Sequence, residues 1–122
     1  MGSDNYSTPR WIMKMFEDWF DPCPLNPMPE VDGLTIDWAS KTYVNPPYSN
    51  PLPWIEKAIK ENKKGHTIAL LLKLDCTTNY YKLLVSNGAH IIHICERVKF
   101  NGRSPPFCNM LCILEGKEQL GK

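Results

Sequence analysis

The segment Thr67–Leu72, with the sequence TIALLL, constrains the fold more than any other part of the chain. It has the length of a strand and is continuously apolar, whereas a strand with one face in water alternates apolar and polar residues. A continuous run of this kind is typical of a strand whose two faces are both covered by protein. Such strands belong to parallel sheets whose connections are helices. The sequence therefore predicts an α/β fold.

Helical periodicity occurs on both sides of this strand and near the beginning of the chain. Large apolar residues recur there at helical spacing, and residues that suit helix starts and stops bound each segment. A hydroxyl residue followed by proline is a favoured start, and glycine is a favoured stop. The predicted helices run from Thr8-Pro9 to Trp19, from Pro51 to Gly65 and from Thr77 to Gly88.

Apolar and β-branched runs predict the strands of the sheet. The last two of them flank an Asn-Gly turn, which favours an antiparallel hairpin. We therefore expect a mostly parallel sheet with a C-terminal antiparallel hairpin. The predicted strands are Lys41–Val44, Thr67–Leu72, His90–Cys95, Arg97–Phe100 and Met110–Leu114.

The size and charge of the chain limit what it can bind. With 122 residues we expect a single domain over residues 1–122, without room for a separate target-recognition domain. Lysine and arginine number 14 and aspartate and glutamate 13, so the net charge of +1 gives no overall basic field for nucleic acid. Loops must therefore provide any recognition of a partner.

Cysteine usage and hydropathy indicate the compartment. The cysteines are odd in number and have no CxxC or Cys/His zinc spacing, so we expect neither a disulfide scaffold nor a metal site. No stretch is long and apolar enough to span a membrane, and no leader pattern is present at the N-terminus. These features predict an intracellular, cytoplasmic protein that does not bind a membrane.

The sequence Asn45-Pro46-Pro47-Tyr48, here the Asn45–Tyr48 motif, directly follows a predicted strand. Ligands of open α/β sheets bind beyond the carboxyl ends of strands, so this is a favoured place for a site. The Asn45 Oδ1 atom and the Pro46 carbonyl are two acceptors that can hold both N–H groups of a planar amine. The prolines restrict the backbone, and the Tyr48 ring can stack on a planar substrate.

This arrangement suits methyl transfer to an aromatic amino group. The amine lone pair is delocalised into the ring, and two acceptors can leave it facing the methyl sulfonium of S-adenosylmethionine. A strong general base is not required, and the three histidines show no catalytic spacing. A simple strand-ending turn would also account for the prolines.

Further polar and aromatic residues are candidates for substrate contacts. Ser49 extends the loop, and Lys73 with Asp75 follows the apolar strand at the same end. The alternating cations of the predicted hairpin suit phosphate contacts, although a surface hairpin explains them equally well. An aromatic ring further along the chain suits stacking on a flipped base. These last three candidates are Arg97, Lys99 and Phe107.

Taken with its flanking segments, the sequence resembles the phage-type DNA N6-adenine methyltransferases, which have a catalytic loop similar to that of Dam enzymes. The similarity covers nearly the whole chain. It rests on Tyr6-Ser-Thr8-Pro9, Phe20-Asp21-Pro22-Cys23-Pro24, Asp32-Gly33-Leu34 with Asp37-Trp38, Val44-Asn-Pro-Pro-Tyr-Ser49, Trp54-Ile-Glu-Lys57, and Arg97-Val-Lys-Phe100 followed by Ser104-Pro-Pro-Phe107.

The resemblance implies a Rossmann-like, S-adenosylmethionine-dependent methyltransferase domain whose catalytic residues are Asn45, Pro46, Pro47 and Tyr48. It also implies that S-adenosylmethionine contacts Tyr6, Thr8, Pro9, Asp21, Pro22, Cys23, Asp32 and Asn45. The chain departs from larger methyltransferases because Asp21-Pro22-Cys23-Pro24 stands where those enzymes have a glycine-rich turn. Without glycine, the backbone must approach the cofactor differently.

The implied substrate is adenine in duplex or single-stranded DNA, taken out of the stack for reaction. With no recognition domain, sequence specificity should be relaxed or short, or should be lengthened by a homodimer. An RNA base or a protein glutamine amide also presents a planar NH2 group and remains an alternative substrate. A non-catalytic module of the same fold that binds nucleic acid or protein is the alternative from another class.

Overall fold

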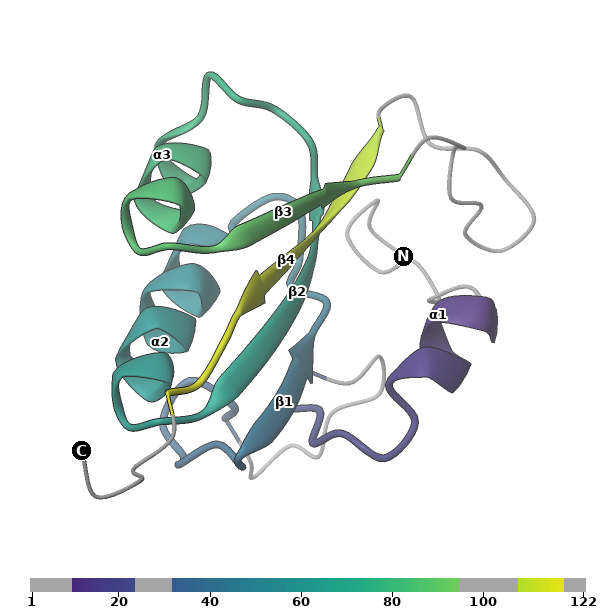
Figure 1. Cartoon of the computed structure of the whole chain (residues 1–122), viewed down its shortest axis with the longest axis vertical. Coiled ribbons are helices and arrows are strands. Elements are labelled where there is room, and N and C mark those ends of the chain that lie inside the picture. Colours follow the sequence, from purple (N-terminus) through teal and green to yellow (C-terminus); the bar gives the residue numbers. More distant parts are fainter. Residues whose placement is uncertain (1–9, 24–31, 95–107, 118–122) are drawn as a thin grey trace.

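The computed structural model describes residues 10–23, 32–94 and 108–117. These residues form a mixed α/β domain around one four-stranded sheet with the order β1-β2-β4-β3 (Figure 1). None of the described helices is long and apolar enough to cross a membrane. The elements are α1 (Arg10–Met15), β1 (Lys41–Val44), α2 (Leu52–Lys63), β2 (Thr67–Lys73), α3 (Asn79–Ser86), β3 (His90–His93) and β4 (Asn109–Leu114).

The strand directions give the sheet one functionally important edge. β1 and β2 are parallel, and β4 is antiparallel to both β2 and β3, so β1, β2 and β3 all point the same way. Phe20 extends this arrangement, because its N–H donates to the Lys41 carbonyl and its carbonyl accepts from Tyr43 N beside β1. We call the edge where β1, β2 and β3 end and β4 begins the carboxyl edge.

The sheet differs in detail from the sequence prediction. The α/β class is confirmed, but the expectation of a mostly parallel sheet is wrong for the named strands. β4 lies between β2 and β3 and is antiparallel to both, so β1 and β2 are the parallel pair among them. The strand predicted at Arg97–Phe100 lies outside the described residues. The first helix ends at Met15 and not at Trp19, because the chain turns after Phe16 to bring Phe20 alongside β1.

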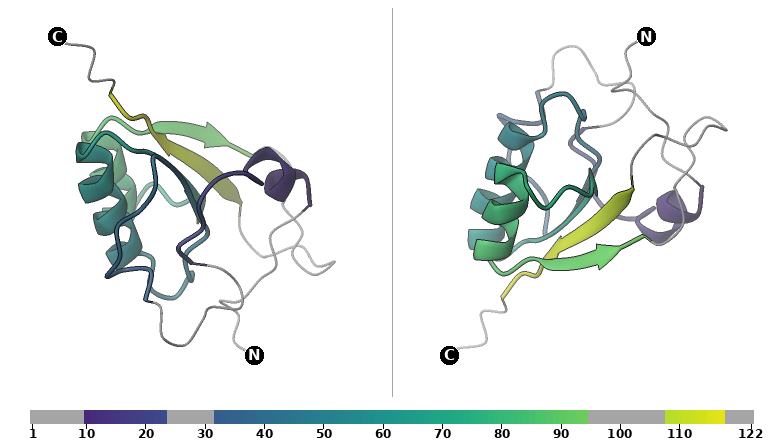
Figure 2. Two further views of the ribbon diagram at one scale, coloured as in Figure 1. Left: turned by 90° about the horizontal axis from the view of Figure 1, so that it is seen from below. Right: turned by 90° about the horizontal axis from the view of Figure 1, so that it is seen from above.

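β2 is covered on both faces, as its apolar run predicts. Figure 2 shows α2 and α3 on one face of the sheet and α1 on the other. Ile68, Leu70 and Leu72 belong to the core under α2 and α3, whereas Ala69 and Leu71 belong to the core under α1. All five side chains are 1% exposed or less, and each large one contributes about 1.5–3 kcal/mol to folding.

The boundaries predicted for the two later helices are confirmed within a few residues. α2 begins after Pro51, and Gly65 follows its end with a φ of 103°. The Thr78 hydroxyl accepts a hydrogen bond from Tyr81 N and caps α3, and Gly88 follows that helix with a φ of 79°. Positive φ angles favour glycine, which explains why these two positions end the helices.

Candidate active site

The Asn45–Tyr48 motif leaves the carboxyl edge in a short, anchored loop. Asn45 is partly exposed directly after β1, and Pro46 is buried. The Pro47 carbonyl accepts a hydrogen bond from Asn50 N at 3.2 Å, which closes a turn with Tyr48 in the middle. β1 ends directly before the motif, and α2 begins two residues after Asn50, so a strand and a helix hold the two ends of this loop.

Tyr48 is tied to a strand from a distant part of the sequence. Asn109, the first residue of β4, donates from Nδ2 to Tyr48 Oη at 3.0 Å and to the Leu72 carbonyl at 3.3 Å. Asn109 is fully buried. The sequence did not predict a role for Asn109, because a single asparagine before an apolar strand carries no signal that it contacts a tyrosine 61 residues away.

Lys73 lies at the carboxyl edge, as predicted. It ends β2 and pairs in register with Asn109, and its carbonyl accepts a hydrogen bond from Tyr80 Oη at 2.7 Å. Asp75 is engaged locally, because its Oδ1 atom accepts hydrogen bonds from Thr77 Oγ1 at 2.6 Å and from Thr77 N at 3.0 Å. These bonds lower the pKa of the Asp75 carboxyl and organise the turn that leads into α3.

The segment Asp21–Cys23 emerges from the same edge, because Phe20 runs parallel to β1. Asp21 Oδ1 accepts a hydrogen bond from Cys23 N at 2.9 Å, which fixes a tight turn. Desolvation raises the pKa of the Asp21 carboxyl, although the bond from Cys23 opposes the shift. Burial and the nearby Asp21 charge raise the pKa of the Cys23 thiol to about 11, so this thiol is not a nucleophile at neutral pH.

A second turn, Asp32–Thr35, packs directly against that segment. Asp32 Oδ1 accepts from Leu34 N at 3.0 Å, and the Asp32 carbonyl accepts from Thr35 N at 2.9 Å. A Cβ atom at Gly33 would overlap the carbonyl of Pro22. A glycine therefore does allow a close backbone approach here, but it belongs to the neighbouring turn and not to the Asp21–Cys23 segment.

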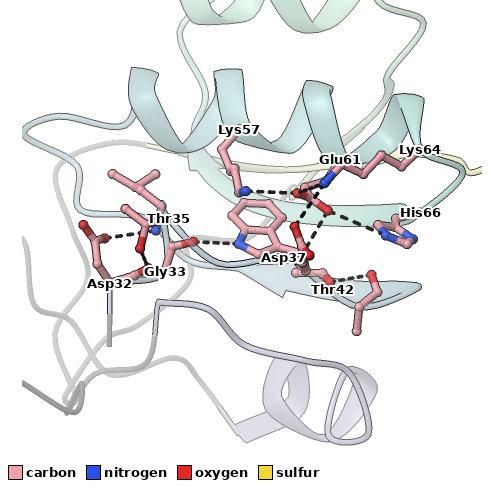
Figure 3. A network of polar contacts seen from close by, with 12 residues as sticks. Asp32, Gly33, Thr35, Asp37, Thr42, Lys57, Glu61, Lys64 and His66 are labelled. Carbon is pink, nitrogen blue, oxygen red and sulfur yellow. Dashed lines mark hydrogen bonds and ion pairs between the residues drawn. The ribbon is translucent and has the colours of Figure 1, made fainter. Parts of the chain in front are cut away.

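A buried polar network fastens this turn to α2 (Figure 3). Trp38 donates from Nε1 to the Gly33 carbonyl at 2.8 Å and from its backbone N–H to Glu61 Oε1 at 3.2 Å. The Glu61 side chain is 1% exposed and forms ion pairs with Lys57 at 3.0 Å and Lys64 at 2.9 Å. Burial alone would raise the pKa of Glu61, but the hydrogen bonds from Lys64, Lys57 and Trp38 outweigh it and lower the pKa.

The described residues thus bring four predicted segments to one region: Asp21–Cys23, the Asp32 turn, the Asn45–Tyr48 motif with exposed Ser49, and Lys73. In the described ranges no group of three histidine, cysteine or acidic residues could hold a metal ion. The other candidates, Tyr6, Thr8, Pro9, Arg97, Lys99 and Phe107, lie outside the described residues.

Comparisons with known proteins assign the chain to a family. The family described as DNA N-6-adenine-methyltransferase (Dam) matches residues 2–107, a range that includes the Asn45–Tyr48 motif. A protein from Haemophilus phage HP1 (strain HP1c1), named DNA N-6-adenine-methyltransferase, is 32% identical over 114 residues and 80% of this chain. The chain spans 66% of that relative's length. No solved structure matches. The chain therefore belongs to the Dam family of DNA N-6-adenine-methyltransferases.

Proposed function

We propose that this protein transfers a methyl group from S-adenosylmethionine to N6 of adenine in DNA. The observation that carries the proposal is the Asn45–Tyr48 motif at the carboxyl edge, with Tyr48 bound to Asn109. Family membership and the name of the phage relative support adenine in DNA as the substrate. The motif itself supports the chemistry, because two acceptors and a ring suit a planar amine.

The proposed mechanism depends on residues that hold the amine. Asn45 Oδ1 and the Pro46 carbonyl accept hydrogen bonds from the two N–H groups of adenine, so the nitrogen lone pair faces the methyl donor. Burial of Pro46 and the turn closed by Asn50 N restrict the loop before substrate arrives. Preorganised acceptors of this kind need little rearrangement during reaction.

Asp21–Cys23 and the Asp32 turn are the proposed cofactor surface. When bound, S-adenosylmethionine supplies an electrophilic methyl group on a cationic sulfur. The chain fits such a group, because the Gly33 contact with Pro22 brings two segments with carboxylates together, and carboxylates suit cationic and hydroxyl groups. Asn45 lies at the same edge of the sheet. Tyr6, Thr8 and Pro9 are proposed to complete this surface.

The DNA is proposed to approach the same edge. A target adenine must leave its stack to reach Asn45, and Tyr48 then stacks on it. Ser49 and Lys73 are proposed to contact the DNA backbone. β3 ends and β4 begins at the carboxyl edge, and residues 95–107 lie between these two strands in the sequence. That position in the sequence supports substrate roles for Arg97, Lys99 and Phe107.

At the level of the whole chain, we propose one reduced, Rossmann-like domain over residues 1–122. Three strands in one direction, with helices on both faces, support this assignment. We further propose that the protein works in the cytoplasm, where DNA and the cofactor are both available. Dimerisation remains the proposed route to a longer DNA footprint.

A transfer assay tests the proposal directly. The purified chain is incubated with S-adenosylmethionine labelled in its methyl group and with DNA, RNA or a glutamine-containing protein, and Asn45→Ala is the inactive control. We expect label in DNA, at N6 of adenine. Label only in RNA or protein would contradict the substrate. No label together with no calorimetric heat of cofactor binding would favour the non-catalytic binding module.

A further inference from the structure

Asn109 is a buried polar residue that has no role in the mechanism proposed above. It begins β4 at the carboxyl edge and is 0% exposed. Its Nδ2 atom has two acceptors, the Leu72 carbonyl and Tyr48 Oη, whereas its Oδ1 atom has no hydrogen-bond partner among the described residues. A buried carboxamide with an unsatisfied oxygen costs stability, so this placement calls for an explanation.

The chemistry of the neighbours fixes which way the carboxamide faces. The Leu72 carbonyl is an acceptor only, so the NH2 group of Asn109 must point toward it. A rotation of the amide by half a turn would place Oδ1 against that carbonyl oxygen. The same NH2 group therefore donates to Tyr48 Oη, and the tyrosine oxygen is the acceptor of this bond.

We propose that Asn109 is a positioning residue that holds the Tyr48 ring in the orientation in which it stacks on the target base. This inference rests on the proposed function. β4 is paired with β2 on one side and with β3 on the other, so Asn109 belongs to a strand that is hydrogen-bonded on both sides. The loop backbone holds one end of Tyr48 and Asn109 holds the other. A ring restrained at both ends loses less freedom when a base binds.

The opposite end of β4 offers a comparison with a purely structural asparagine. Asn62 Nδ2 donates to the carbonyls of His66 at 2.9 Å, Leu114 at 3.2 Å and Glu115 at 3.1 Å. All three acceptors are backbone atoms. Asn109 differs because one of its two bonds goes to a side chain of the catalytic motif. Asn62→Ala is therefore a matched control that loses a carboxamide tie to the same strand, far from the site.

The test is a double-mutant cycle on the full chain. Methyl transfer is measured against DNA concentration for wild type, Tyr48→Phe, Asn109→Ala and the double variant. Since both single changes remove the same hydrogen bond, each should raise KM for DNA roughly fivefold, and the double variant should be no worse than either. We expect kcat to change by less than about twofold, because the bond acts on base binding and not on methyl transfer.

Several outcomes would overturn the inference. Additive effects of the two changes, or an Asn109→Ala profile equal to that of Asn62→Ala, would reduce Asn109 to a structural residue. If Asn109→Ala fails to fold, Tyr48→Phe decides alone, because it keeps the ring and the Leu72 bond; an unchanged KM would then refute the inference. A wild-type chain that methylates no DNA would refute the proposed function itself, and the inference with it.

Discussion

Among single residues, Asn45 should have the sharpest effect on catalysis. Asn45→Ala removes one of the two acceptors proposed to hold the amine, and we expect kcat to fall about 100-fold or more. The dissociation constant of the cofactor should change far less. Single-turnover methylation and calorimetry measure the two quantities separately.

The same loop contains a matched control for this change. Asn50 is exposed, and its bond to the Pro47 carbonyl uses its backbone N–H, which alanine keeps. Asn50→Ala should therefore retain most of the activity. If Asn45→Ala also retained full turnover, the amine-holding role would be wrong.

Gly33 supports a second prediction about a single residue. In Gly33→Ala the new methyl group meets the Pro22 carbonyl, so the two turns of the proposed cofactor surface must move apart. We expect a loss of about 1–3 kcal/mol of unfolding free energy and at least a roughly tenfold weaker affinity for S-adenosylmethionine. Thermal unfolding and calorimetry test the two effects.

A glycine at the end of α3 separates these effects. Gly88 has a φ of 79°, and a methyl group added there would meet no atom within 4 Å. Gly88→Ala should therefore cost about 1 kcal/mol through backbone strain alone. Its affinity for the cofactor should equal that of the wild type. Equal losses of affinity in both variants would mean that general stability, and not the Gly33 contact, controls cofactor binding.

The sequence predicted elements well where the determinants are local. The cap at Thr78, the glycines at 65 and 88, and the apolar run of β2 gave the positions of α2, α3 and β2. The position of Asn45–Tyr48 directly after a strand was predicted in the same way. These elements could be predicted from the sequence because the residues that determine each one lie within a few positions of it.

Contacts between segments that are distant along the chain could not be predicted from the sequence. The bond from Asn109 to Tyr48 spans 61 residues, and Trp38 reaches Glu61 across 23. In a helical pattern Glu61 is indistinguishable from exposed glutamates, although its side chain is 1% exposed. The position of β4 between two parallel strands likewise depends on pairing, which a single sequence does not specify.

The link between α2 and the Asp32 turn predicts a pH-dependent stability. The pKa of Glu61 is lowered from its ordinary value of 4.5, so its ion pairs stabilise the fold above that pH and are lost as pH falls through the lowered pKa. Glu61→Gln should cost about 1–3 kcal/mol at neutral pH. The difference from wild type should shrink as the pH falls below 4.5 and through the lowered pKa, as measured by chemical unfolding at a series of pH values.

An exposed glutamate on the same helix provides the control. Glu56 lies on the solvent side of α2, so Glu56→Gln should change stability by less than about 0.5 kcal/mol at any pH. If Glu61→Gln showed the same small and pH-independent effect, the network around Trp38 would not stabilise the turn.

For the whole molecule, the sheet explains how a short chain assembles a site. Phe20, β1 and β2 all end at the carboxyl edge, and β4 begins there. Segments separated by tens of residues thereby meet at one edge of the sheet. The described helices cover the two faces of the sheet (Figure 2), so the loops at this edge are the proposed contacts for cofactor and DNA.

A site built from the loops at one edge of the sheet predicts a short target sequence. A single small module commonly reads about three to four base pairs, and a net charge of +1 gives little general attraction to DNA. If one copy of the 122-residue chain reads the target, the methylated adenines should share a context of that length. The measurement is sequencing of methylated adenines after expression in a host without adenine methylation, with Asn45→Ala as the blank. A longer, two-fold symmetric motif would contradict reading by one copy and would require two chains on the DNA.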